Sequence, residues 1–360
     1  MPDVRRILIV KLSAMGDVLH ALPAVTYLRK AAPKAEIDWA VDTRFAELLE
    51  GNPGIAKVVP LPIREWKGRL GSPATWREAR NAAEALRGRK YDLAIDLQGN
   101  IKSGVVTYLS GAPLRYGFPR ETARERQNLW FTNRQPPAVE GDRHVTQKIL
   151  RVASAPFGGE FRVDDLKGEI TNTPEEIAAA ERLLFDAFPG AAPRLAMHPG
   201  TTWNTKRMDP SFWAETVQLL RATFPSMGVF LSWGTEKERE ECLAIRYMAG
   251  EGVVLLPRLG YKALAAVYRA CGHMIGPDTG PLHLAAAVGA KTVSVFRGSD
   301  GKYAAPVGSA HRFLQAPLPC TACQIKGDKV CPRDAECRAT IHPAEVATAM
   351  AELMGGNENR

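Results

Sequence analysis

The stretch RILIVKLSAMGDVLH, residues 6–20, decides the fold that we expect for this chain. Residues 6–11 form an apolar run that predicts a buried strand, and the residues from His20 onward show the pattern of an amphipathic helix. A strand that turns directly into a helix is the first half of a βαβ unit. Such turns usually carry several glycines so that a phosphate can approach the helix N-terminus, but here Gly16 stands alone and Asp17 follows it.

Asp17 has two interpretations at this stage. A carboxylate would repel an anion, so the turn is unlike a dinucleotide cradle, and Asp17 could be a base directed into a ligand site. Acidic residues also favour the first turn of a helix, so Asp17 could equally be a capping residue. The fragment alone leaves both interpretations open.

Short apolar runs and helical segments alternate along the rest of the chain, which predicts parallel sheets built from βαβ units. The expected strands are residues 7–10, 37–41, 58–61, 93–97, 114–117, 195–198, 229–233, 273–276 and 292–296. The expected helices are residues 21–30, 45–50, 75–87, 102–110, 174–188, 211–223, 237–248, 261–271, 282–288 and 343–354.

A polar, proline-containing stretch at residues 164–174 divides this alternation into two similar halves. We therefore expect an α/β protein with two Rossmann-like, doubly wound domains that face a central cleft. The N-terminal domain would cover residues 1–170 and the C-terminal domain residues 171–340. The last segment, residues 341–360, would be a helix that packs back on the N-terminal domain.

The composition is that of a globular protein, with 45% hydrophobic and 24% charged residues among 360. No apolar run approaches the roughly 18 residues of a membrane helix, and the start has no secretory pattern, so we expect a cytoplasmic protein. The net charge is +8, and between Leu61 and Arg134 there are 14 Lys and Arg against seven Asp and Glu. Such an excess suits nucleic acid, an anionic substrate or an acidic membrane surface, or it is only a solvated face.

Three loops of the second half follow expected strands and carry groups that suit a nucleotide diphosphate. Residues 199–207 contain a glycine, three threonines and two cations, and residues 233–238 contain acidic side chains that could accept ribose hydroxyls. Residues 276–283 place Thr279 and Gly280 at a helix N-terminus, where backbone amides bind anions. The chain has neither a P-loop nor an Asp-x-Asp pair, so we expect cations and a helix dipole to neutralise the diphosphate.

Three motifs together resemble the lipopolysaccharide heptosyltransferases of glycosyltransferase family 9. They are residues 11–20, 198–206 and 277–283, and the likeness runs in order over nearly the whole chain. Residues 62–67, 96–103 and 121–125 are most similar to the type I group, which adds the first heptose to Kdo.

The resemblance implies a GT-B fold, with the acceptor on the N-terminal domain and ADP-heptose on the C-terminal domain. It also implies inverting transfer without a metal, with Asp17 as general base and Lys206 as the residue that stabilises the departing ADP. The implied donor-binding residues are Thr201, Thr202, Lys206, Glu238, Asp278, Thr279, Gly280 and His283. The implied acceptor-binding residues are Ser13, Gly16, Arg64, Lys67, Lys102, Arg120 and Arg124.

The partners implied are ADP-heptose, Kdo-lipid A or a related core saccharolipid, and the anionic inner face of the inner membrane, where the protein would be peripheral. Without an RRM, OB or KH signature we expect no nucleic-acid binding. Another acceptor, as in type II enzymes, and a nucleotide-sugar epimerase of the same fold are the alternatives. His20 and His283 have structural roles as the first interpretation.

Four cysteines are clustered near the C-terminus: Cys320, Cys323, Cys331 and Cys337. Their spacing fits plain thiols, which we place first, or a structural metal site, which we place second. A disulfide ranks third for a cytosolic protein. No cofactor is required for catalysis in any of these cases.

Overall fold

The structure is a computed structural model that describes residues 4–355. The chain divides into two compact units, of which the first ends at Thr171 and the second begins at Asn172. Each unit has its own parallel β-sheet, as the alternation of strands and helices in the sequence predicts. No helix in residues 4–355 combines the length and the apolar character needed to cross a bilayer.

The first unit contains a five-stranded parallel sheet with the order β3-β2-β1-β4-β5. Its strands are β1 Arg6–Val10, β2 Glu36–Asp42, β3 Lys57–Leu61, β4 Leu93–Asp96 and β5 Leu114–Tyr116. All five expected strands are confirmed: β1, β2 and β4 are almost wholly buried, whereas β3 and β5 are only partly buried. The strand order reverses between β1 and β4, and ligands of such sheets bind outside the carboxyl ends of the strands at this switch point.

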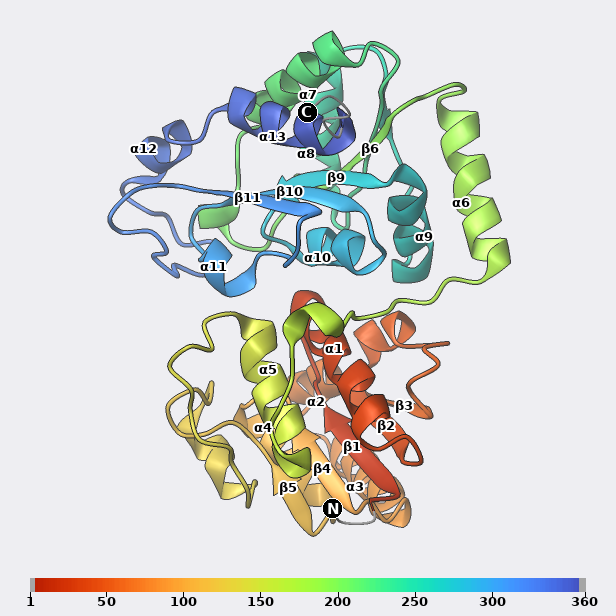
Figure 1. The fold of residues 1–360 in the computed structure, drawn as a ribbon, viewed down its shortest axis with the longest axis vertical. Helices are drawn as coiled ribbons and strands as arrows, with labels where there is room; N and C mark the ends of the chain where they lie inside the picture. The colour runs from red at the N-terminus through yellow and green to blue at the C-terminus, as the bar shows by residue number, and fades with distance from the viewer. Residues whose placement is uncertain (1–3, 356–360) are drawn as a thin grey trace. The chain divides into compact units, whose positions relative to one another are not determined.

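Helices cover both faces of the first sheet (Figure 1). They are α1 Met15–Ala31, α2 Ile63–Gly68, α3 Pro73–Gly88, α4 Ile101–Leu109 and α5 Val145–Ser154, with 3₁₀ turns η1 Thr43–Leu48, η2 Arg126–Trp130, η3 Ala155–Phe157 and η4 Val163–Asp165. Helices α1 and α5 pack side by side on one face. Leu8 and Val10 point to the other face, where they pack in one cluster with Leu86 of α3 and Val106 of α4.

In the first unit one expected helix is a 3₁₀ turn, and two helices, α2 and α5, were not expected. The segment around residues 45–50 is the 3₁₀ turn η1, in which the Asp42 side chain accepts a hydrogen bond from the Arg44 amide. Helix α5 was not expected at all, although its His144 cap and its buried apolar face are present in the sequence.

The second unit contains a six-stranded parallel sheet with the order β11-β10-β9-β6-β7-β8. Its strands are β6 Arg194–Met197, β7 Gly228–Leu231, β8 Val253–Leu255, β9 His273–Pro277, β10 Lys291–Phe296 and β11 His311–Gln315. The four strands that we expected are confirmed, and β8 and β11 are additional. The order reverses between β6 and β9, so the switch point lies where two of the three expected nucleotide loops begin.

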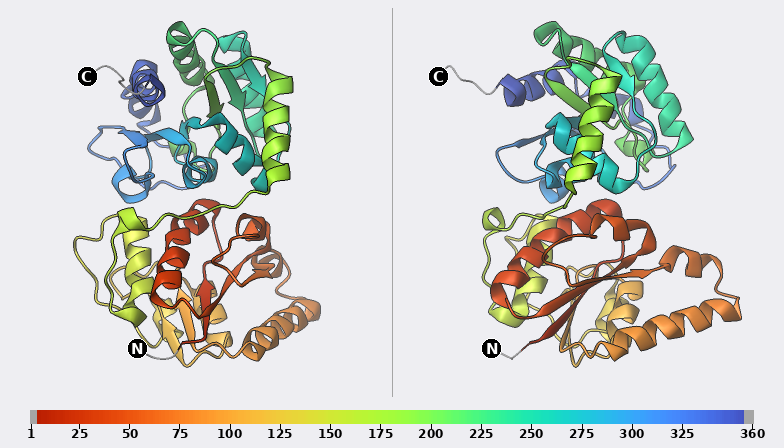
Figure 2. Two further views of the ribbon diagram at one scale, coloured as in Figure 1. Left: turned by 45° about the vertical axis from the view of Figure 1, so that its right-hand side comes forward. Right: turned by 90° about the vertical axis from the view of Figure 1, so that its right-hand side faces the viewer.

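Helices also cover both faces of the second sheet. They are α6 Pro174–Ala187, α7 Pro210–Thr223, α8 Glu236–Ala249, α9 Tyr261–Cys271, α10 Gly280–Ala287, α11 Gly301–Ala304, α12 Asp334–Ala339 and α13 Pro343–Gly355, with the 3₁₀ turn η5 Asn204–Lys206. Thr173 caps α6, with Pro174 at the first helical position. Helix α6 lies along α9 (Figure 2).

The C-terminal helix α13 packs within the second unit. Val346, Met350 and Leu353 are buried in the same cluster as residues of α7 and β10. The apolar face of α13 thus completes the core of the unit to which the helix is connected, and packing of this helix on the N-terminal domain stays a prediction.

Candidate active site

Asp17 lies in the first turn of α1, just beyond the carboxyl end of β1. Its side chain is 23% exposed and receives a hydrogen bond from Arg124 Nη1 at 3.2 Å. The Ala14 amide also points at Asp17 Oδ2, but over 3.4 Å, which makes it a weak cap. The helix-capping contact is therefore present, and the carboxylate has a closer partner in Arg124.

Two charges control the ionisation of Asp17. Partial burial opposes ionisation, but the Lys11 ammonium and the Arg124 guanidinium outweigh it, and the pKa of Asp17 lies below its usual value. Lys11 is itself buried, and its Nζ donates to the Leu97 carbonyl oxygen at 2.8 Å. The result is an ionised carboxylate at neutral pH that is accessible to a small group.

Residues that the sequence interpretation did not assign hold the β1–α1 turn in place. Gln98 Oε1 accepts hydrogen bonds from the amides of Leu12 at 2.6 Å and of Ser13 at 3.1 Å. The buried Asp96 carboxylate accepts in turn from the Gln98 amide at 2.8 Å and from Asn128 Nδ2 at 2.6 Å. The segment 96–103 had been noted only as a family motif, and the signal for its role is that it follows β4, the neighbour of β1.

The expected acceptor-binding cations are all exposed, and all lie on segments that follow the carboxyl ends of strands. Arg64 and Lys67 belong to α2 after β3, and Lys102 belongs to the first turn of α4 after β4. Arg120 and Arg124 lie in the loop after β5. In a parallel sheet these segments share one edge, so the structure brings the cations to the edge that carries Ser13, Gly16 and Asp17.

A second cluster of charged residues lies in the second unit, centred on Asp278 at the end of β9. The Asp278 carboxylate accepts hydrogen bonds from Lys206 Nζ at 2.5 Å and from Ser299 Oγ at 2.6 Å, and His283 Nε2 lies 3.2 Å away. Burial opposes ionisation of Asp278, but the contacts with His283 and Lys206 outweigh it, so its pKa lies well below the usual value. The structure thus brings together three of the expected donor residues.

An aromatic ring holds Lys206 from another side. The Lys206 ammonium lies 4.1 Å from the centre of the Trp203 ring, and Lys326 Nζ lies 5.6 Å from the same ring. Both distances are within the range of cation–π attraction. Lys326 was missed because it lies in the cysteine loop, which the sequence analysis considered only for its thiols. It adds a second cation at this point.

The remaining donor candidates surround this cluster. Thr201 Oγ1 lies 3.5 Å from the Asp278 carbonyl oxygen, and Thr202 is exposed on the same loop. Thr279 is the N-cap of α10 and Gly280 its first residue, so their amides belong to the end of the helix that attracts anions. A cationic side chain and a helix N-terminus therefore meet at the β6/β9 switch point.

Glu238 accepts hydrogen bonds at the N-terminus of its own helix and is also a donor-binding candidate. Its Oε2 accepts hydrogen bonds from the amides of Gly234 at 2.8 Å and Thr235 at 3.0 Å, which form a capping box for α8. The carboxylate also lies close to the loop after β6, because a Cβ at Gly200 would be 2.5 Å from the Glu238 carboxyl carbon. Glu238 is thus fixed between two of the expected nucleotide loops.

Behind these loops lies a buried polar chain that the sequence interpretation did not predict. His198 Nδ1 lies 3.1 Å from Ser232 Oγ, which lies 2.7 Å from the Tyr268 hydroxyl oxygen. Burial lowers the pKa of His198 to about 4, so the ring is neutral near pH 7. These groups support the ends of β6 and β7.

Both histidines near the candidate sites have side-chain contacts in the structure. His20 Nδ1 contacts Thr146 Oγ1 at 3.3 Å, and its ring packs edge-on against His144. His283 is buried and faces Asp278.

The four clustered cysteines line one small cavity together with Arg297, Arg333 and Asp334. All six cysteines of the chain are free thiols, so no disulfide is present. Within residues 4–355, no three His, Cys, Asp or Glu side chains are grouped as ligands for a metal ion. The geometry therefore gives no support to a bound metal at this loop.

The cysteine loop is attached to the loop that carries Lys206. Thr205 Oγ1 donates to the Ile325 carbonyl oxygen at 2.8 Å, and the Asn204 amide donates to the Gly327 carbonyl oxygen at 3.0 Å. The loop thus supports the position of η5.

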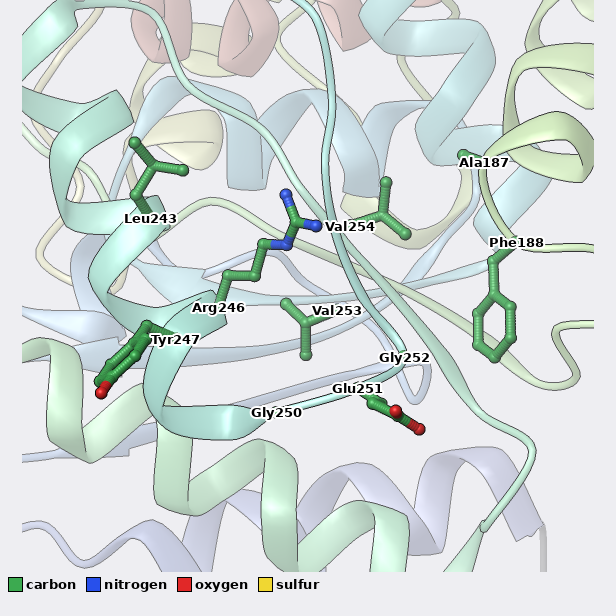
Figure 3. Close-up of a pocket in the computed structure, with 10 residues that line it drawn as sticks. All are labelled: Ala187, Phe188, Leu243, Arg246, Tyr247, Gly250, Glu251, Gly252, Val253 and Val254. Atoms are coloured by element: carbon green, nitrogen blue, oxygen red, sulfur yellow. The ribbon is translucent and has the colours of Figure 1, made fainter.

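A larger cavity of about 740 Å³ lies elsewhere in the second unit (Figure 3). It is lined by the ends of α6 and α8 and by the start of β8, including Phe188, Tyr247 and Val253. This is the amino edge of the sheet, opposite to the edge of the Asp278 cluster, and the cavity contains none of the expected site residues.

The chain is similar to known proteins both in sequence and in structure. Residues 79–332 match the family model of glycosyltransferase family 9 (heptosyltransferase). The chain is 31% identical to lipopolysaccharide heptosyltransferase 1 of Pseudomonas aeruginosa, over 97% of this chain and 98% of that protein.

Two solved structures are similar over most of the chain. Escherichia coli heptosyltransferase WaaC with ADP-2-deoxy-2-fluoro heptose is 28% identical with a TM-score of 0.71, over 87% of this chain and 93% of that one. The same enzyme with ADP is 26% identical with a TM-score of 0.76, over 97% and 99% of the two chains. These structures are GT-B heptosyltransferases, and the expected fold class is confirmed.

Proposed function

This chain belongs to glycosyltransferase family 9, the heptosyltransferases, and from this premise we propose that it transfers heptose from ADP-L-glycero-D-manno-heptose to a Kdo-lipid A acceptor in lipopolysaccharide inner-core synthesis. The family resemblance expected from the sequence is thereby confirmed. The geometric observation that carries the proposal is the meeting of Lys206 with the N-terminus of α10 at the β6/β9 switch point. The relatives named heptosyltransferase 1, and the WaaC structures with ADP and an ADP-heptose analogue, support this choice of donor.

The donor diphosphate would bind to positive charge supplied by the second unit. Lys206 would contact it directly, and the amides of Thr279 and Gly280 would donate hydrogen bonds to phosphate oxygens. Thr201, Thr202 and His283 would complete this site, and Glu238 would accept the ribose hydroxyls. Lys206 donates a hydrogen bond to Asp278, which holds the ammonium at the place where the diphosphate would bind.

The transfer step would be an inverting displacement that needs one base and one stabilised leaving group. Asp17 takes the proton of the acceptor hydroxyl, whose oxygen bonds to the anomeric carbon from the face opposite the diphosphate. The bond between that carbon and the diphosphate breaks, its electron pair leaves with ADP, and Lys206 stabilises the charge. The cations make a metal ion unnecessary in this scheme.

The acceptor would bind to the first unit. Ser13, Gly16 and the exposed cations Arg64, Lys67, Lys102, Arg120 and Arg124 share the edge that carries Asp17. Their charge suits the carboxylates of Kdo and the phosphates of lipid A. A lipid acceptor places the enzyme at the cytoplasmic face of the inner membrane as a peripheral protein.

The direct test is to incubate the protein with ADP-heptose and a panel of lipid A cores of increasing length, in parallel reactions with and without a chelator. A mass gain of one heptose on Kdo-lipid A is the expected result. A mass gain that is seen only on heptosyl-Kdo-lipid A would mean that the protein uses the acceptor of a type II enzyme. No gain on any core, or a gain that the chelator abolishes, would contradict the proposed donor chemistry.

A further inference from the structure

Helices α2 and α3 form an arm, residues 63–88, with an exposed apolar tip. Leu70 and Trp76 are 56% and 62% exposed, and Trp76 Nε1 donates to the Leu70 carbonyl oxygen at 2.8 Å, so the two residues form one pair. In the right-hand view of Figure 2 the arm, coloured orange, extends away from the first sheet. Two large apolar side chains are thus presented together at a projecting point of the first unit.

The tip is held in this conformation by contacts inside the arm. Trp66 Nε1 and Arg69 Nη2 both donate to Glu78 Oε2, at 3.0 and 3.2 Å. Thr75, the neighbour of Trp76, is buried, and Trp66 packs against the core of the unit. Because α3 is fixed in this way, Trp76 is directed outward by the fold.

The charge around the tip is positive. Residues 63–80 contain five Lys and Arg against two Glu. Arg69 is paired with Glu78, but Arg64, Lys67 and Arg77 are exposed and form no ion pair with another described residue. A Trp and a Leu flanked by unpaired cations suit the surface of an anionic bilayer. Indole rings lie among the lipid headgroups there, and cations bind the lipid phosphates.

We propose that the α2–α3 arm docks the first unit onto an anionic lipid bilayer, with Leu70 and Trp76 entering the headgroup region. Helix α2 begins next to the end of β2, where the Arg64 amide donates to Asp42 Oδ2 at 3.3 Å. The arm therefore starts at the same sheet edge as Asp17. Docking would bring that edge, with Asp17, to the lipid surface. This placement serves catalysis only under the proposed function, in which the acceptor is itself a membrane lipid.

The test is cosedimentation of the full chain with vesicles of phosphatidylcholine alone or with one third phosphatidylglycerol. Wild-type protein is expected to bind the anionic vesicles, and the Leu70→Ser/Trp76→Ser double variant to bind at least about tenfold more weakly. Tyr247→Ser is the matched control, because Tyr247 is an aromatic residue that is 90% exposed on the other unit. Trp76→Leu keeps an apolar side chain and is expected to retain most of the binding.

Three results would overturn the proposal. They are equal vesicle binding by wild type and double variant, no wild-type binding to anionic vesicles, and an arm-dependent dimer in solution, which would assign the tip to a second copy of the chain. Thermal unfolding of each variant separates lost docking from lost folding. Binding needs no sugar donor, so a failure of heptose transfer would contradict the proposed function and leave the docking result intact.

Activity provides a second readout. The double variant is expected to be slow on Kdo-lipid A embedded in vesicles and to match wild type on a deacylated, water-soluble acceptor. Equal slowing on both acceptors would assign the arm to catalysis and contradict docking.

Discussion

Asp17→Asn removes the charge of the proposed base and keeps the size of its side chain. Loss of a general base lowers turnover by about a hundredfold to ten-thousandfold, which corresponds to about 3–5 kcal/mol of transition-state stabilisation. The structure limits the other effects of this change. The Asp17 contacts all lie in the first unit, so the affinity for ADP, which we assign to the second unit, should stay within about twofold of wild type.

The substitution also leaves Lys11 buried with one neighbouring anion fewer. Its Nζ keeps the hydrogen bond to the Leu97 carbonyl oxygen, so the expected loss of folding stability is modest, about 1–2 kcal/mol. Thermal unfolding measures this loss and shows whether the variant is folded at the assay temperature.

The assay is the rate of ADP release at saturating donor and acceptor, with calorimetric titration of ADP in parallel. A folded variant whose turnover stays within about fivefold of wild type would refute the role of Asp17 as base. Weaker ADP binding without a change in turnover would refute the proposal that the first unit supplies the base and the second unit binds ADP.

Three further predictions concern the charged partners. Lys206→Ala should weaken ADP binding by about tenfold or more and slow transfer as well, because a charge-assisted contact to the diphosphate is lost; unchanged titration and unchanged rate would remove Lys206 from the donor site. Arg124→Leu should shift the acidic limb of the pH–rate profile to higher pH, since Arg124 lowers the pKa of Asp17 and the base acts only when ionised. A limb that stays in place or moves to lower pH would contradict this coupling. Asp278→Asn should destabilise the fold near pH 7 by about 3 kcal/mol, because Lys206 and His283 lose a buried anion. The folded pKa of Asp278 is depressed, so its contribution is complete above the usual carboxyl pKa and decreases as the pH falls below it; unfolding curves at several acidic pH values should show the two proteins converge.

The central strands were predictable from sequence because they are buried on both faces and therefore consist of continuous apolar runs. The two missed strands lack this signal. β8 has three residues, of which Val254 and Leu255 are only partly buried, and the edge strand β11 reads His-Arg-Phe-Leu-Gln. The position of α13 was not predictable either, because an apolar helix face does not reveal which of two cores it completes.

The sequence indicates candidate site residues where one short segment carries the relevant chemistry, as for Asp17 and Lys206. Contacts between distant segments were not predictable in this way. Lys206 and Asp278 are 72 residues apart, and Gln98 lies 85 residues from the turn amide of Ser13 that it fixes. Such pairs form only because parallel strands place their following loops at one edge, and the strand order that decides which loops meet is a property of the whole sheet.

Each unit closes its own hydrophobic core and carries a whole set of functional groups, with the division at Thr171 and Asn172. Under the proposed assignment of donor and acceptor to different units, the two preferences can change independently in evolution, since a substitution in one core does not disturb the other. In this proposal, a chimera joined at this peptide bond would inherit its acceptor from the parent of residues 1–171 and its nucleotide sugar from the parent of the remainder.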